Sequence, residues 1–73
     1  MTVYGYELWQ HETSGEKFVT ELNDRNKVTG VCGPLTEDEV KAWEVEPADA
    51  EYDRDDVQWF SRQPMRLLAM VDA

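Results

Sequence analysis

The sequence predicts an α+β fold, with a three-stranded antiparallel β-meander followed by two short helices and an apolar C-terminal segment. Three observations predict it. Side chains alternate with a period of two over the first third of the chain. A capping pattern then opens a stretch with helical spacing. The chain is also 41% hydrophobic with three tryptophans, enough large side chains to build a core. At 73 residues we expect a single compact domain over residues 1–73.

The meander is expected over about residues 2–33. In VYGYELWQ (residues 3–10), Tyr4, Tyr6 and Leu8 fall on one side of an extended chain. KFVTEL (17–22) resumes the alternation with Phe18 and Leu22 on one side, and VTGVCG (28–33) supplies a third, β-branched strand.

Two turn sequences connect these strands. HETSGEK contains Gly15, which adopts a positive φ without strain. NDRNK contains Asn26, which tolerates the left-handed conformation better than most residues. Short turns between strands favour an antiparallel meander.

Helices are expected over about residues 37–44 and 54–63. Thr36 and Glu39 have the spacing of a capping box at the start of the first helix, although VKAWEV is also compatible with a strand. Asp53 is the expected N-cap of the second helix, and Pro64 ends it. The segment MRLLAMV (65–71) is compatible with either a strand or a helical turn.

The net charge of −9 is concentrated in one segment. Residues 36–56 carry ten acidic and two basic residues, a net charge of −8. Such a surface repels nucleic acids and anionic membranes and attracts basic proteins. The candidate partner-binding residues are Glu37, Asp38, Glu44, Glu46, Glu51, Asp55 and Asp56.

A second candidate surface is apolar. If Tyr4, Tyr6, Leu8, Phe18 and Leu22 face the helices, then Trp9, Val19 and Val31 lie on the other side of the sheet. There they would either form an interface for a partner or a second copy, or be covered by the C-terminal segment.

Metal and phosphate sites are not expected. Asp53 and Asp55 match the first two ligands of a calcium loop, but Val57 and Gln58 occupy the positions of the third ligand and the glycine. The Gly30–Gly33 spacing has a simpler explanation, because glycines permit a β-bulge or a tight turn.

An enzyme is not expected either. Cys32 and His11 could form a thiolate–imidazole pair, but a lone cysteine is more often a small buried hydrophobe. We therefore expect no catalytic residues, no metal and no cofactor.

The sequence thus favours a non-catalytic protein-binding module that presents a negative surface to a basic partner, as a nucleic-acid mimic does. The alternative is a small assembly protein that forms a homodimer through the outer face or an edge of its sheet. The single cysteine, the absence of a recognisable signal peptide and the absence of a long apolar run lead us to expect a cytoplasmic protein. Direct binding of nucleic acid or membrane is not expected.

Overall fold

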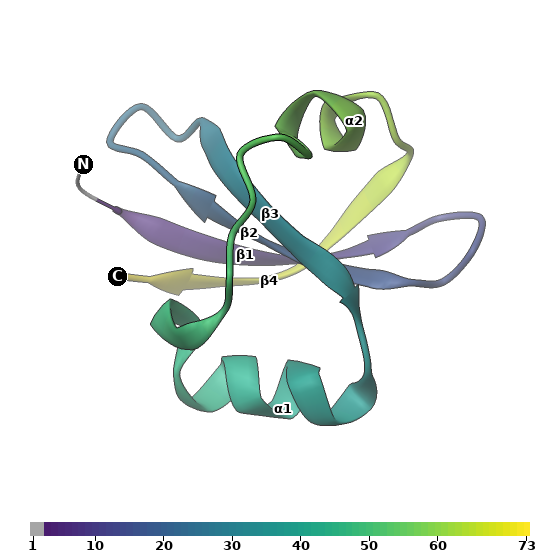
Figure 1. Cartoon of the computed structure of the whole chain (residues 1–73), viewed down its shortest axis with the longest axis horizontal. Helices are drawn as coiled ribbons and strands as arrows, with labels where there is room; N and C mark the ends of the chain where they lie inside the picture. Colours follow the sequence, from purple (N-terminus) through teal and green to yellow (C-terminus); the bar gives the residue numbers. More distant parts are fainter. Residues whose placement is uncertain (1–2) are drawn as a thin grey trace.

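The structure, a computed structural model, describes residues 3–73. Four strands form one antiparallel sheet in the order β3-β2-β1-β4 (Figure 1). Their bounds are β1 Gly5–His11, β2 Lys17–Leu22, β3 Val28–Leu35 and β4 Met65–Asp72. The predicted meander is confirmed as β1–β3; its expected start at residue 2 lies outside the described residues.

The helices follow the meander, as predicted. Helix α1 spans Glu37–Val45, a 3₁₀ turn (η1) spans Pro47–Asp49, and α2 spans Val57–Ser61. Helix α2 is shorter than the predicted 54–63. The segment 51–55, which precedes it, runs along β3 and makes a β-bridge from Asp53 to Val31, with N–O distances of 2.8 and 3.0 Å. This pairing holds the chain extended and delays the start of the helix.

The apolar C-terminal segment is a strand. β4 pairs with β1 in antiparallel register, from Gly5 opposite Asp72 to His11 opposite Met65. A β-bulge in β4 leaves Leu68 without a partner between Ala69, which lies opposite Leu8, and Leu67, which lies opposite Trp9. It returns beside the first strand of the meander and becomes a terminal strand of the sheet.

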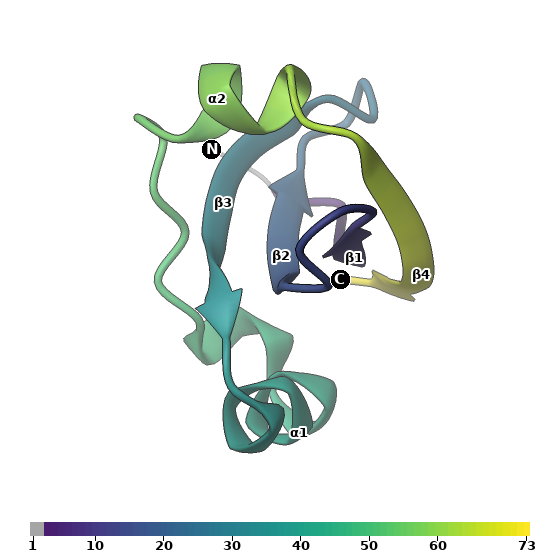
Figure 2. The same cartoon turned by 90° about the vertical axis from the view of Figure 1, so that its right-hand side faces the viewer.

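Each face of the sheet is covered by a different helix, as Figure 2 shows. On one face, α1 contributes Val40 and Trp43 to a core with Tyr6, Leu8 and Val19. On the other face, α2 contributes Phe60 to a smaller core with Phe18 and Val31.

The predicted division of the side chains between the two faces is partly wrong. Phe18 and Leu22 do share a face with Thr20, because they alternate along β2. However, Leu8 pairs with Val19 and Trp9 pairs with Phe18. Since directly opposed residues in a sheet point to the same side, Val19 lies with Leu8 under α1, and Phe18 lies with Trp9 under α2.

Both predicted turns are confirmed. Gly15 has φ of 75° and Asn26 has φ of 58°. In the second turn the Asn23 Oδ1 accepts the backbone N–H groups of Arg25 at 2.9 Å and Lys27 at 3.1 Å. These bonds fix the loop that positions β3 against β2.

Candidate functional site

A groove with a volume of about 370 Å³ lies between α1, η1 and the end of β3. Its apolar wall is formed by Leu35, Ala42, Trp43 and Ala50. Its carboxylates are Glu39, Glu46, Asp49 and Glu51, and Cys32 completes the lining. We call this feature the acidic groove. Apolar walls with carboxylates around them suit a long side chain that has an aliphatic stem and a cationic head.

Tyr52 fixes the two sides of the acidic groove to each other. Its hydroxyl accepts a hydrogen bond from Trp43 Nε1 at 2.9 Å and donates one to the Pro47 carbonyl at 2.7 Å. Its ring stacks on Tyr6 of the sheet, with a centroid distance of 5.5 Å. Burial raises the pKa of the Tyr52 phenol, so the hydroxyl keeps its proton and both hydrogen bonds.

The start of α1 is built as the sequence predicts. The Thr36 side chain accepts the Glu39 N–H at 3.2 Å, and Glu39 Oε1 accepts the Thr36 N–H at 2.9 Å. The neighbouring carboxylates Glu37 and Asp38 occupy the first turn of the helix, where the helix dipole favours negative charge. Both are exposed, as is Glu44 on the same helix.

The predicted acidic residues do not form one patch. Glu46 and Glu51 lie in the acidic groove, whereas Asp55 and Asp56 precede α2, which lies on the other face of the sheet. Sequence reasoning missed Glu39 and Asp49 as groove residues. The spacing of Glu46 and Asp49 around Pro47 indicates a turn, but not that the turn folds back toward α1.

The expectation that Asp53 caps α2 is wrong. The N-cap is Asp56, and its side chain makes no capping bond. The Asp53 Oδ1 instead accepts the Asp55 N–H at 2.8 Å, which stabilises the bend before the helix. The backbone N–H and C=O groups of Asp53 are hydrogen-bonded to Val31 in the β-bridge, and this pairing keeps Asp53 extended and outside the helix start.

Cys32 and His11 are not brought together. Cys32 is half-buried in the acidic groove and pairs with Val19 across the sheet. Burial raises the pKa of its thiol, and the carboxylates of Glu39 and Glu51 raise it further, against a partly offsetting hydrogen bond from the Glu51 backbone. A thiol with a raised pKa is a poor nucleophile.

His11 has a structural role at the end of β1. Its Nδ1 accepts the backbone N–H groups of Thr13 and Ser14, each at 3.2 Å. Its Nε2 lies 3.1 Å from Gln63 Oε1, and with Nδ1 accepting, Nε2 carries the proton and donates. The ring thereby connects the first turn to the segment after α2.

The expected exposed patch of Trp9, Val19 and Val31 is not present on the surface. Val19 and Val31 are 0% and 2% exposed. Trp9 is half-buried, packs edge-on against Phe60 with a centroid distance of 5.4 Å, and donates from Nε1 to Thr20 Oγ1 at 3.0 Å. Helix α2 covers Trp9 and Val31, and α1 covers Val19 on the opposite face, whereas the sequence suggested a partner or the C-terminal segment.

Glu7 is a buried carboxyl group that sequence reasoning did not single out. It is 8% exposed and accepts a hydrogen bond from Thr20 Oγ1 at 3.4 Å. Burial raises its pKa, and the hydrogen bonds from Thr20 and Trp9 oppose that rise. Glu7, Thr20 and Trp9 thus form one polar network on the face of the sheet that carries α2.

Gly30 and Gly33 lie at the irregular pairings of β3 with β2, in line with the predicted bulges, and both are also required for close packing. A Cβ at Gly30 would lie 2.7 Å from the Tyr52 Cβ, and one at Gly33 would lie 2.6 Å from the Phe18 ring. Gly33 also has a φ of 148°. The spacing of the two glycines therefore has a packing explanation.

Within residues 3–73, no three or more His, Cys, Asp or Glu side chains are grouped so as to hold a metal ion. Over the same range, no helix has the length and apolarity needed to cross a membrane. Comparison of the chain with protein-family models, curated proteins and solved structures found no significant match.

Proposed function

We propose that this chain is a non-catalytic protein-binding module whose acidic groove receives a lysine or arginine side chain from a basic partner protein. One observation carries the proposal: Glu39, Glu46, Asp49 and Glu51 line the same groove as several apolar side chains. The aliphatic stem of the partner's side chain would pack on Leu35 and Ala42, while its charged head meets Glu46 and Glu51.

The wider charge distribution supports the same proposal. The net charge of −8 over residues 36–56 attracts a basic surface before contact is made. Glu37, Asp38 and Glu44 are exposed on α1, the helix that forms one side of the groove, and add to this field. A protein that binds nucleic-acid phosphates would meet a comparable pattern of negative charge, so we include nucleic-acid-binding proteins among the expected partners.

The raised pKa of Cys32 supports a binding role over a catalytic one, because it disfavours the thiolate that nucleophilic catalysis needs. A single thiol in the groove also fits a reducing compartment, so we propose a cytoplasmic protein.

The test is binding of an arginine-rich peptide and of proteins from a cell lysate, at about 50 mM and about 500 mM salt. The variant Glu46→Gln/Glu51→Gln removes two charges from the groove. Its matched control, Glu12→Gln/Asp24→Asn, removes two charges from exposed turns elsewhere.

We expect the groove variant to bind at least tenfold more weakly than the control at low salt, a loss of about 1.4 kcal/mol or more in binding free energy. High salt should weaken binding by the unmodified chain. Equal binding by the two variants would show that only net charge matters and would refute a role for the groove.

A further inference from the structure

Among the described residues 3–73, no strand pairs with the outer edge of β4. Three of the exposed large apolar side chains lie on this one strand: Leu67 at 40%, Leu68 at 39% and Met70 at 63% exposure. The opposite edge of the sheet, at β3, is partly closed by the β-bridge between Val31 and Asp53. Long terminal strands with apolar centres tend to pair with other strands.

The direction of the backbone groups along β4 follows from the ends of its ladder. The Ala73 N–H donates to the Tyr4 carbonyl at 3.2 Å, and the Glu12 N–H donates to the Pro64 carbonyl at 2.8 Å. In antiparallel pairs, residues that face the neighbouring strand alternate with residues that face away. From the Pro64 end, Met65 and Leu67 therefore face the open edge, and from the Ala73 end, Asp72 and Met70 do. The bulge at Leu68–Ala69 separates the two halves of the strand.

We propose that the open edge of β4 binds β4 of a second copy of this chain, in antiparallel register, with a two-fold axis between Leu68 and Ala69. In this register Leu67 lies opposite Met70 of the second copy, and Met65 lies opposite Asp72. Every edge-facing residue is then paired with another edge-facing residue. The bulge falls on the axis in both strands, so neither strand has an extra residue that the other lacks.

The side chains are self-complementary in the same register. Leu67 pairs with Trp9 and Met70 pairs with Glu7, so both point to the face that carries α2. An antiparallel two-fold pairing keeps each face of the sheet on the same side. Leu67 and Met70 of the two copies therefore form one apolar strip that continues from Trp9.

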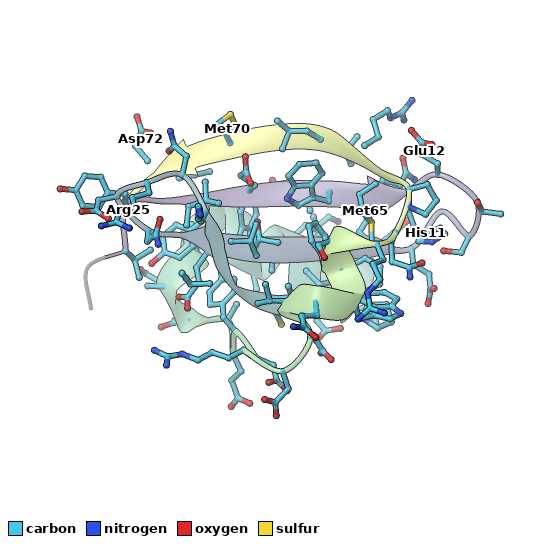
Figure 3. All side chains as sticks on the ribbon, turned by 90° about the horizontal axis from the view of Figure 1, so that it is seen from above. His11, Glu12, Arg25, Met65, Met70 and Asp72 are labelled. Atoms are coloured by element: carbon cyan, nitrogen blue, oxygen red, sulfur yellow. The ribbon has the colours of Figure 1, made fainter. Side chains whose placement is uncertain are left out.

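Charge identifies a second copy as the occupant. β4 carries one basic and one acidic residue, Arg66 and Asp72, in a chain with a net charge of −9. Met70 and Asp72 lie at the free edge of the sheet (Figure 3), on the side away from β3 and the segment between the helices. Two copies joined here keep their acidic segments apart, whereas a strongly basic partner is drawn to those segments and away from this edge.

The test is sedimentation of the full chain from about 1 µM to about 1 mM. We expect a monomer–dimer equilibrium that high salt strengthens, because the two protomers repel each other. Met70→Lys places a charge on the edge and should weaken the dimer at least tenfold. Val45→Lys makes the same change at an 83% exposed site on α1 and should leave it unchanged. Circular dichroism checks that both variants fold.

Disulfide trapping tests the register. In a Cys32→Ser background with oxidised glutathione, a mixture of Leu67→Cys and Met70→Cys chains should form mixed disulfides in preference to disulfides between identical chains. A monomer at every concentration, equal dimerisation by the two lysine variants, or no preference for mixed disulfides would each overturn the proposal.

Discussion

Removal of the Tyr52 hydroxyl should destabilise the protein and loosen the acidic groove. Tyr52→Phe keeps the ring on Tyr6 but leaves the Trp43 Nε1–H and the Pro47 carbonyl without their partner. Trp43 is only 3% exposed, so water has little access to its N–H, whereas Pro47 is half-buried and its carbonyl has better access. A buried group left unsatisfied costs about 1–3 kcal/mol, and with one group well buried we expect a loss of about 1–2 kcal/mol.

For a domain of this size, that loss lowers Tm by roughly 4–16 °C. The measurement is urea unfolding followed by far-ultraviolet circular dichroism, because the substitution alters the surroundings of Trp43 and would disturb its fluorescence. Tyr4→Phe is the matched control, since Tyr4 is 57% exposed. If the two variants were equally stable, within about 0.3 kcal/mol, the proposed role of the hydroxyl would be refuted.

The pH dependence gives a second measurement. Burial raises the pKa of Tyr52 above its usual value of about 10. Above that pH, the unfolded chain loses this proton while the folded chain keeps it, so the free energy of unfolding falls as pH rises. Tyr52→Phe removes this contribution, and its stability should fall less steeply than that of the unmodified chain above about pH 10. Parallel curves would contradict the raised pKa.

Four further predictions concern stability. Gly30→Ala should cost about 1–3 kcal/mol in urea unfolding because its Cβ would lie 2.7 Å from the Tyr52 Cβ; an unchanged midpoint would contradict this packing. Glu7→Gln should raise Tm at pH 7 and change it little near pH 4. The folded pKa of Glu7 is raised, so its unfavourable contribution grows as pH rises from the unfolded value through the folded one; an equal Tm change at both pH values would argue against a buried charge. Asp53→Ala should cost about 0.5–1.5 kcal/mol, because Asp53 Oδ1 accepts the Asp55 N–H, and it should cost more than Asp56→Ala, whose side chain makes no capping bond; the reverse order would mean that the Asp56 side chain caps α2. Raising salt from about 50 mM to about 500 mM should raise Tm by screening repulsion over residues 36–56; a constant Tm would show that this repulsion is not significant.

The strands and the first helix could be predicted because their determinants are local. The alternation in residues 3–10 and 17–22 requires only neighbouring positions, and Thr36 and Glu39 satisfy each other within one turn. The positive φ values of Gly15 and Asn26 follow in the same way from residue type.

The assignment of faces could not be predicted because it depends on register. Phe18 and Val19 are adjacent and both apolar, so either one could oppose Leu8. A slip of one residue moves every side chain of a strand to the other face. Only the geometry of the turn at residues 12–16, together with two helices that cover both faces, settles that Leu8 pairs with Val19.

The acidic groove depends on contacts between distant segments, and this explains why only part of it was found. Glu46 and Glu51 were identified by their charge. The sequence pattern predicts only a capping role for Glu39 and no functional role for Asp49. Both join the groove because Tyr52 connects the chain after η1 back to Trp43. The spacing of residues in the sequence does not predict the hydrogen bond between Trp43 and Tyr52.

The acidic groove and the β4 edge are proposed independently, but together they predict how the chain binds a partner with two basic segments. They lie near opposite edges of the sheet, so a dimer joined through β4 would carry its two acidic grooves at its outer ends. Such a dimer binds one basic segment no more tightly than a monomer does. It binds two linked basic segments far more tightly when the linker spans both grooves, because the second contact becomes intramolecular. Met70→Lys should therefore leave the affinity for a single arginine-rich peptide unchanged and reduce the affinity for a tandem peptide with a long linker. A loss for the single peptide as well would mean that the β4 edge and the groove are one site.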